Sequence, residues 1–498
     1  MLIQKGNIMK KNKIKKFLND YMKWTPSTIV ILVVLSIPFL LFFVMPFKLN
    51  NDFWFLINTG KYIINNGIPH TEPFTIHSNL SFVAQQWLTD VIFYLIYNKF
   101  NIYGMYIFIL ISNIVIVFLL YKLALLISNK VKVSMITTSI IDIMLVIVFV
   151  TTRPQVFDII LLILELYLLE LYIKKNNKKY LIGLPIISLL MINLHASVWP
   201  MIFVFLLPYY VGRINLKFNN KENYKLKPLI IVTIVTFICG FINPYGIEAM
   251  IYLFNSYEIN QINNLVGEMK PLTINNGKLI YIYILFIITT YIINKNSKIN
   301  FRYMLLLLGT TLLSLQHVKG ELFFLISSIL IVNYNLKDSF IEEKNSNNSN
   351  KYLNIILLFI VFMISIVLIS NQKFIGENEH YLHNLSDILK ENATSDDLIY
   401  TGYDEGGYIE YQGFKCYIDP RAEVFLKSNN KQKDIFIEYY NLRTGVINYK
   451  DFLNTYNFDY LVVAFYENIL FTYIDESKNY TLIYNENNKL KLYKKIEE

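Results

Sequence analysis

The chain has 498 residues, of which 54% are hydrophobic and 17% are charged. Soluble domains carry about 25% charged residues, so the composition argues against a fully water-soluble protein, and an aromatic content of 16% excludes a disordered one. The net charge of +9 is divided unevenly, because residues 371–498 hold 14 basic and 21 acidic residues, whereas the rest of the chain holds 32 and 16. The basic excess lies in short clusters between apolar runs, which is typical of a membrane protein and gives no reason to expect a nucleic-acid partner.

Long apolar runs divide the first three quarters of the chain. A helix needs about 20 apolar residues to cross the hydrocarbon core of a bilayer. We therefore expect an α-helical polytopic membrane protein with about eleven transmembrane helices, although several runs are short and residues 180–211 are also compatible with a re-entrant pair. The candidate spans are Thr28–Phe47, Tyr103–Ile127, Ser134–Val150, Val156–Ile173, Tyr180–Leu194, Ser197–Val211, Pro228–Ile242, Leu279–Ile293, Tyr303–Leu315, Glu321–Asn335 and Tyr352–Ser370.

Lysines and arginines in alternate connections indicate the orientation. One set of connections holds 25 of the 32 basic residues before the tail, and the other set holds seven. Connections rich in Lys and Arg face the cytoplasm. We therefore expect a multi-pass plasma-membrane protein with a basic cytoplasmic N-terminus (1–27), a transmembrane domain (28–370) with a long first external loop (48–102), and an extracytoplasmic domain (371–498).

The tail from residue 371 differs from the rest of the chain in both charge and periodicity. Short β-rich runs alternate there with helix-like stretches, which predicts a small, separate, soluble α/β domain. The expected strands are Lys415–Ile418, Tyr460–Phe465, Tyr480–Tyr484 and Leu490–Tyr493, and the expected helices are Tyr381–Glu391, Lys433–Tyr440 and Tyr449–Tyr456.

The connections expected to face outward gather ionisable side chains beside apolar helices. Such side chains are costly at a membrane boundary unless they pair or take part in function. The candidates are Asp52, Arg153, His195, His317 and Lys319. Each also has a structural interpretation: a cation can extend to the membrane interface, a histidine can cap a helix, and an aspartate can stabilise the N-terminus of the helix that follows it.

The first external loop is expected to begin with an amphipathic helix. Apolar and polar positions alternate at helical spacing after Asp52 until Gly67–Pro69 interrupts the pattern. Trp54 in this helix is compatible with an aromatic anchor at the membrane interface. A second segment of this kind, Gln85–Tyr97, is too short to cross a bilayer.

Motifs spread along the chain resemble those of one family. Asp52–Gly60, followed by Gly67–Thr75 and by Gln86–Leu88, resembles the first external loop of bacterial multispanning GT-C-type glycosyltransferase-like proteins. In that family the pattern reads Asp-x-Trp-aromatic, then Gly, then Gly-x-Pro-x-x-Asp-Pro-Phe-Ser/Thr, and then Glu-Trp-Leu. Similar motifs follow in the same order at Arg153–Gln155, Asn193–His195, Asn243–Gly246, Gly406–Tyr408 and Asp419–Arg421.

The resemblance implies a GT-C-like fold and the transfer of a sugar from a polyprenyl phosphate at the outer face of the membrane. The implied partners are the lipid bilayer, the polyprenyl-phosphate sugar, and an envelope glycan, lipid or protein as acceptor. Asp52 is then the expected catalytic base, which accepts the proton of the acceptor. The residues expected to bind substrate or phosphate are Glu72, Arg153, His195, His317, Lys319, Trp54 and Trp87.

The sequence leaves the cofactor open. Some proteins of this architecture use a divalent metal, and His70, Glu72 and His77 lie on one loop with suitable ligand atoms. Their spacing matches no established metal motif, so we assign no metal ligands.

The chain also departs from the family pattern. Glu72 stands in place of the usual aspartate, which keeps the charge, but Gln86 stands in place of the glutamate before Trp87, which removes one charge. Asp52 is retained. The alternative function is therefore a non-catalytic polytopic membrane protein whose C-terminal domain binds envelope glycans or partner proteins.

The expected topology places the lysine-rich connection 174–179 in the cytoplasm and the tail outside. In a chain whose Cys239 and Cys416 are replaced by serine, Asn176→Cys and Asn429→Cys should label from opposite sides of the membrane. In intact cells only the cysteine at 429 should react with a membrane-impermeant maleimide. Labelling of both positions from outside would contradict the topology.

Overall fold

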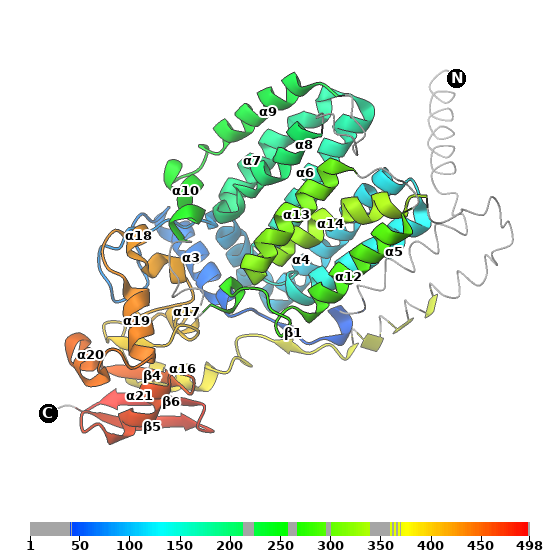
Figure 1. Ribbon diagram of the computed structural model, residues 1–498. Coiled ribbons are helices and arrows are strands. Elements are labelled where there is room, and N and C mark those ends of the chain that lie inside the picture. Colours follow the sequence, from blue (N-terminus) through cyan, green and yellow to red (C-terminus); the bar gives the residue numbers. More distant parts are fainter. Residues whose placement is uncertain are drawn as a thin grey trace, which may run out of the picture.

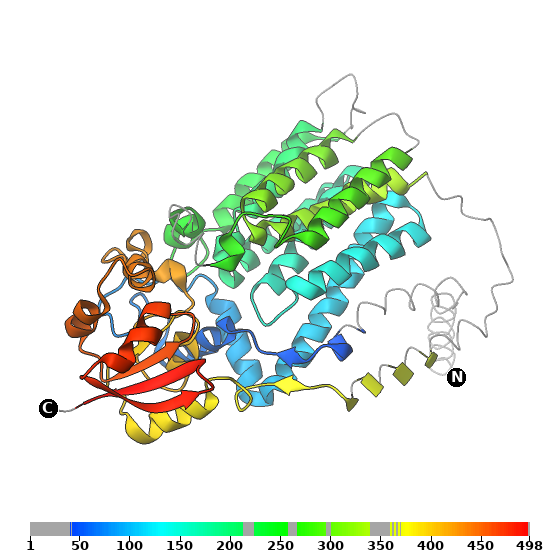
Figure 2. The same ribbon diagram turned by 60° about the horizontal axis from the view of Figure 1, so that its bottom comes forward.

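The computed structural model describes residues 42–212, 224–256, 266–294, 300–338 and 370–496, with residue 40 and a few positions between 359 and 368. This part of the chain is mostly helical and contains two small sheets. Most of its helices form an elongated bundle, and the C-terminal domain lies at one end of that bundle (Figure 1 and Figure 2).

The bundle helices coincide with the apolar runs of the sequence. Nine of the eleven expected spans fall on helices, whereas the first and the last lie largely outside the described residues. The helices are α4 (Trp87–Ser128), α5 (Val131–Val148), α6 (Gln155–Lys175), α7 (Gly183–Leu194), α8 (Met201–Val211), α9 (Leu226–Cys239), α12 (Lys278–Ile293), α13 (Phe301–Gln316) and α14 (Glu321–Leu336), with a short α10 (Ile247–Ser256) at the end near the tail. Within the described residues only α4 and α5 have both the length and the apolar composition to cross a membrane, so a count of eleven crossing helices stays a prediction.

Residues 48–102, which the sequence predicts to form the first external loop, contain two helices that pack on each other. α3 (Asp52–Asn66) ends at Gly67, whose φ of 85° is readily adopted by glycine, as the sequence predicts. α4 continues for 42 residues apart from a break at Asn101 (φ 53°, ψ −154°), so its first part is the short helix expected after the loop. α3 and α4 cross closely at Gly60, where a Cβ would lie 2.1 Å from the carbonyl oxygen of Asp90.

The C-terminal domain is built on a four-stranded sheet. Its strand order is β3-β4-β6-β5, in which β3 and β4 are parallel and the other two pairs are antiparallel. Its elements are β2 (Phe374–Ile375), α16 (His383–Asn392), β3 (Ile399–Thr401), α17 (Gly406–Tyr411), α18 (Lys427–Asn430), α19 (Ile435–Arg443), α20 (Tyr449–Tyr456), β4 (Tyr460–Ala464), α21 (Asn468–Tyr473), β5 (Tyr480–Glu486) and β6 (Leu490–Lys495). The expected strand at residues 415–418 forms only isolated bridges at Cys416, because that segment lies between β3 and Thr75 of the external loop.

The C-terminal domain is joined to the first external loop rather than separate from it. β1 (Phe47–Lys48) pairs with β2 in parallel, and α17 packs on α3. The backbone N–H of Ile76 donates to the carbonyl oxygen of Cys416, and that of Ser81 donates to Asn430. The loop and the tail therefore form one continuous structure at the end of the bundle.

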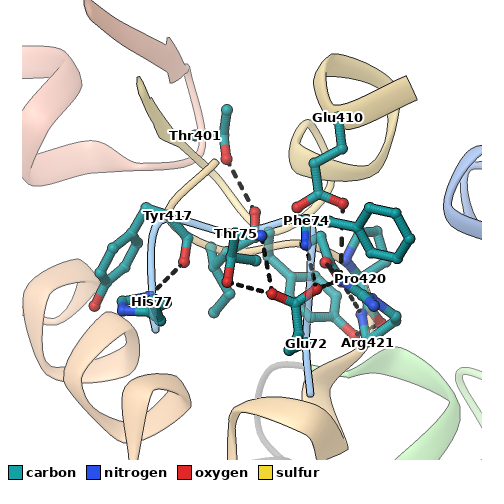
Figure 3. Close-up of polar contacts among 12 residues, drawn as sticks. Glu72, Phe74, Thr75, His77, Thr401, Glu410, Tyr417, Pro420 and Arg421 are labelled. Atoms are coloured by element: carbon teal, nitrogen blue, oxygen red, sulfur yellow. Dashed lines mark hydrogen bonds and ion pairs between the residues drawn. The ribbon is translucent and has the colours of Figure 1, made fainter. Parts of the chain in front are cut away.

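Arg421 of the tail is buried among carboxylates from both parts of the chain (Figure 3). Its guanidinium donates to Glu72 at 2.9 Å and to Asp419, and Glu410 lies 3.7 Å away. Glu72 also accepts hydrogen bonds from the backbone N–H and the hydroxyl of Thr75. Burial and the charge of Asp419 raise the pKa of Glu410 well above its usual value. We call these four charged side chains the Arg421 cluster.

Removal of Arg421 should loosen the tail from the loop. Arg421→Met leaves the carboxylates of Glu72 and Asp419 buried without their cation, which typically costs about 3–5 kcal/mol. Thermal unfolding of the protein purified in detergent should show a clearly lowered midpoint. Lys431→Met is the matched control, because Lys431 forms an exposed ion pair with Glu248 and such pairs contribute at most about 1 kcal/mol. Equal shifts in the two variants would contradict a structural role for the Arg421 cluster.

Candidate functional site

A cavity of about 460 Å³ lies between the end of the bundle and the C-terminal domain. One side is formed by α3, by the loop before α4 and by the connections that carry Arg153, His195 and Lys319, and the tail forms the other side. The structure thus brings Asp52 and these three basic residues to one cavity from four separate parts of the sequence.

Asp52 and Arg153 form an ion pair on the cavity wall. Asp52 is the first residue of α3, where a negative charge is stabilised by the helix N-terminus. Its carboxylate oxygen lies 2.6 Å from Arg153 Nη2, and Arg153 Nη1 contacts Glu268. The side chains of Asp52 and Arg153 remain 26% and 21% exposed, so both are accessible to a ligand in the cavity.

Burial and ion pairing act in opposite directions on Asp52. Desolvation raises the pKa of its carboxyl group, the charge of Arg153 lowers it, and acidic neighbours raise it again, with the result that the pKa is about 6. A carboxylate with this pKa is mostly ionised at neutral pH and binds a proton more strongly than an ordinary aspartate does. These are the properties of an effective general base.

His195 is held in place by a second carboxylate. It directly follows the last residue of α7, and its Nδ1 lies 2.6 Å from Oδ2 of Asp158 in α6. Both side chains are almost completely buried. A carboxylate bound to one ring nitrogen fixes the orientation of an imidazole and leaves the other nitrogen for a ligand.

Lys319 brings another positive charge to the cavity. It lies in the 3₁₀ turn Val318–Gly320, directly before α14. Within the part of the chain that the structure describes, its ammonium group has no hydrogen bond and no ion pair. Desolvation raises the pKa of Glu268, but the charges of Arg153 and Lys319 outweigh it and hold this pKa below its usual value. Lys319 is therefore a cation close to the Arg153–Glu268 pair.

The C-terminal domain supplies polar side chains to the opposite wall. They are Tyr403, Asp404, Arg421, Glu423, Tyr439 and Arg443. Gln85 connects the two walls, because its side-chain amide donates to Glu423 at 3.2 Å while its side-chain oxygen accepts from the backbone N–H of Ser197 at 3.3 Å. The site therefore needs both the bundle and the tail.

Three predicted residues do not line the cavity. Trp54 is 1% exposed and packs among aromatic rings of the tail, so it joins α3 to the C-terminal domain instead of anchoring the loop to lipid. Trp87 donates its Nε1–H to the side chain of Asn193 at 2.9 Å. His317 ends α13, and its Nδ1 lies 2.7 Å from the carbonyl oxygen of Met269, which places it as a support for the turn that carries Lys319.

Glu72 is also absent from the cavity lining, because it belongs to the Arg421 cluster. The alternative metal site on the same loop is not assembled: His77 Nε2 contacts the carbonyl oxygen of Tyr417 at 2.8 Å, and the ring of His70 packs against Tyr245. Among the described residues no group of three or more His, Cys, Asp or Glu side chains is arranged to hold a metal ion.

Several residues that line or support the cavity are not among the predicted site residues. Asp158, which holds His195, is one of three acidic residues in the apolar helix α6, and an acidic residue in such a helix is itself a signal. Glu423 belongs to the segment Asp419–Glu423, which follows a β-rich run of the sequence where ligands often bind. Glu268 and Asp404 lie in polar segments, where nothing in the sequence distinguishes them from solvent-exposed acids.

No protein-family model matches this sequence, and a search of curated proteins finds no match. The resemblance to GT-C-type proteins therefore depends on the motifs themselves, and the chemistry must be argued from the cavity.

Proposed function

We propose that this chain is a membrane glycosyltransferase that moves a sugar from a polyprenyl-phosphate donor to an envelope acceptor at the outer face of the plasma membrane. The proposal depends chiefly on the Asp52–Arg153 ion pair in a cavity that also contains Lys319. Sugar transfer from a phosphate requires a base for the acceptor and cations for the leaving group. The polyprenyl donor and the outer location come from the motif resemblance and from the lysine distribution.

The proposal includes a multi-pass arrangement of about eleven helices in the bilayer. Large apolar side chains on the outside of the bundle support it, since such groups are stable in lipid and costly in water. On α12, for example, Ile282 and Leu285 are each 63% exposed and Ile292 is 76% exposed. In this arrangement the cavity and the C-terminal domain lie at the outer end of the bundle.

The transfer assigns a role to each side of the Asp52–Arg153 pair. The oxygen of the acceptor hydroxyl forms a bond to the anomeric carbon while the bond from that carbon to the phosphate oxygen breaks. The hydroxyl proton passes to Asp52, and the electron pair of the broken bond remains on the phosphate. Arg153 and Lys319 stabilise the charge that grows there, and His195 offers a further hydrogen-bonding group.

One observation favours the non-catalytic alternative. Gln86, which stands where the family has a glutamate, lines the same cavity as Asp52. A glutamate at this position, as in the family pattern, would therefore lie in the site itself. A substitution at Asp52 separates the two functions.

Asp52→Asn keeps the shape of the side chain but removes the proton acceptor. The rate of sugar transfer should fall about 10²–10⁴-fold, the usual contribution of a general base, while the amount of protein in the membrane stays normal. The measurement is consumption of the polyprenyl-phosphate sugar in membranes, together with restoration of envelope glycans in a deletion strain. Asp451→Asn, at an exposed position of α20, should leave the rate unchanged. Full restoration by Asp52→Asn would favour the non-catalytic function.

The pH dependence follows from the ionisation of Asp52. A base must be unprotonated to act, so kcat/KM should fall about tenfold per pH unit below the pKa, which is about 6 in the folded protein. Arg153→Gln removes the charge that lowers this pKa, so the acidic limb of the remaining activity should move to higher pH. An unchanged limb in Arg153→Gln would assign the titration to another group.

A further inference from the structure

The proposed function leaves the acceptor undefined, and the charges on the two walls of the cavity differ. On the bundle side Arg153 is paired with Asp52 and Glu268, and Lys319 is a cation without an ion pair among the described residues. On the tail side Arg421 is paired with Glu72 and Asp419, whereas Asp404 and Glu423 are acids without an ion pair among the described residues. We propose that the tail wall is the acceptor subsite and that it selects an acceptor with a protonated amine, such as an amino sugar. The role of the bound amine as an acceptor rests on the proposed function. Binding of an amine to this wall is tested independently of it.

Asp404 and Glu423 lie close enough to Asp52 to act on the same ligand. The negative charges of both contribute to raising the pKa of Asp52, and all three residues line one cavity. A ligand whose amine is bound between the two tail carboxylates therefore has its neighbouring hydroxyl groups near the proposed base.

The two tail carboxylates are available to a ligand. Neither forms an ion pair with another described residue, and the side chain of Glu423 accepts only the 3.2 Å hydrogen bond from Gln85. Two cations also line this wall, and both are engaged elsewhere. Arg421 is paired with Glu72 and Asp419, and Arg443 is held 5.1 Å over the ring of Tyr466, whose carbonyl oxygen accepts from it. The charge of Arg443 lowers the pKa of Asp404 by less than burial raises it. Asp404 therefore does not form a close ion pair with Arg443.

A second feature points to a polar ligand in the cavity. Five residues that line it have a buried polar side-chain atom without a hydrogen-bond partner in the described structure: Asp90 Oδ1, Arg153 Nε, Gln155 Oε1, Ser197 Oγ and Arg421 Nη1. Asp90 is only 2% exposed. Buried polar atoms are normally paired, and a ligand rich in hydroxyl groups supplies both donors and acceptors.

Charge complementarity decides between classes of acceptor. An anionic acceptor on the tail wall meets two carboxylates of its own sign, which disfavours binding. A neutral sugar forms hydrogen bonds to the two carboxylates but carries no positive charge to complement theirs. A protonated amine gains charge-assisted hydrogen bonds, which are the stronger kind.

Ligand binding to the purified full-length protein tests the subsite without any transfer assay. Titration calorimetry near neutral pH with glucosamine, N-acetylglucosamine and glucose should give binding at least about tenfold tighter for glucosamine, since hydrogen bonds to charged groups are worth more than neutral ones. The double variant Asp404→Asn/Glu423→Gln should lose this preference, and Asp451→Asn should keep it. Equal binding of the three sugars, or an unchanged preference in the double variant, would overturn the proposal. If the double variant does not fold, as judged by thermal unfolding, Glu423→Gln alone carries the same test.

A donor probe keeps this test distinct from that of the proposed function. Farnesyl phosphate should bind the unmodified protein, bind more weakly to Lys319→Met, and bind normally to the double variant of the tail wall. Glucosamine binding without farnesyl phosphate binding would support the amine subsite and count against the glycosyltransferase. The reverse result would support a phosphate donor and remove the amine subsite.

Discussion

The burial of Arg421 is the constraint on which the site depends. Its guanidinium is 6% exposed and takes Glu72 from the external loop and Asp419 from the tail as partners. Neither partner tolerates separation, because an unpaired charge in this position is costly. The cluster therefore helps to hold the C-terminal domain over α3, and in that position the domain forms the second wall of the cavity.

Once the two walls are fixed, desolvation controls the chemistry between them. The pKa of Asp52 is about 6 because burial outweighs the attraction of Arg153. A more exposed aspartate would have a lower pKa, and an aspartate without Arg153 would have a higher one. Arg153 contacts the carboxylates of both Asp52 and Glu268. Lys319 forms no ion pair with another described residue, so its charge is available to a ligand in the cavity.

The sequence predicts the local structure well and the packing of the tail poorly. Apolar periodicity places nine helices, and the Gly67–Pro69 break ends α3 where expected, because these signals are encoded within a few residues. The convergence of Asp52, Arg153, His195 and Lys319 follows from counting which connections share a side. The Asp419–Arg421 pair has a local signal in the motif itself. The contact of Arg421 with Glu72 joins residues about 350 positions apart and has none, so the sequence predicts Glu72 and Trp54 as ligand-binding residues although they join the loop to the tail.

Gln86, which stands where the family resembled by the motifs has a glutamate, has a different meaning once the cavity is seen as a whole. In the proposed reaction a carboxylate near Asp52 can bind the acceptor if it lies at the right place in the cavity. Which segment of the sequence carries that carboxylate does not matter. Glu423 reaches the same cavity from the tail, and Gln85, the neighbour of the altered position, donates directly to it. The cavity thus presents an acidic group in addition to Asp52, and the tail supplies it. Loss of one carboxylate from the loop is for this reason a weak argument against catalysis, whereas loss of the Glu423 carboxylate would be a strong one.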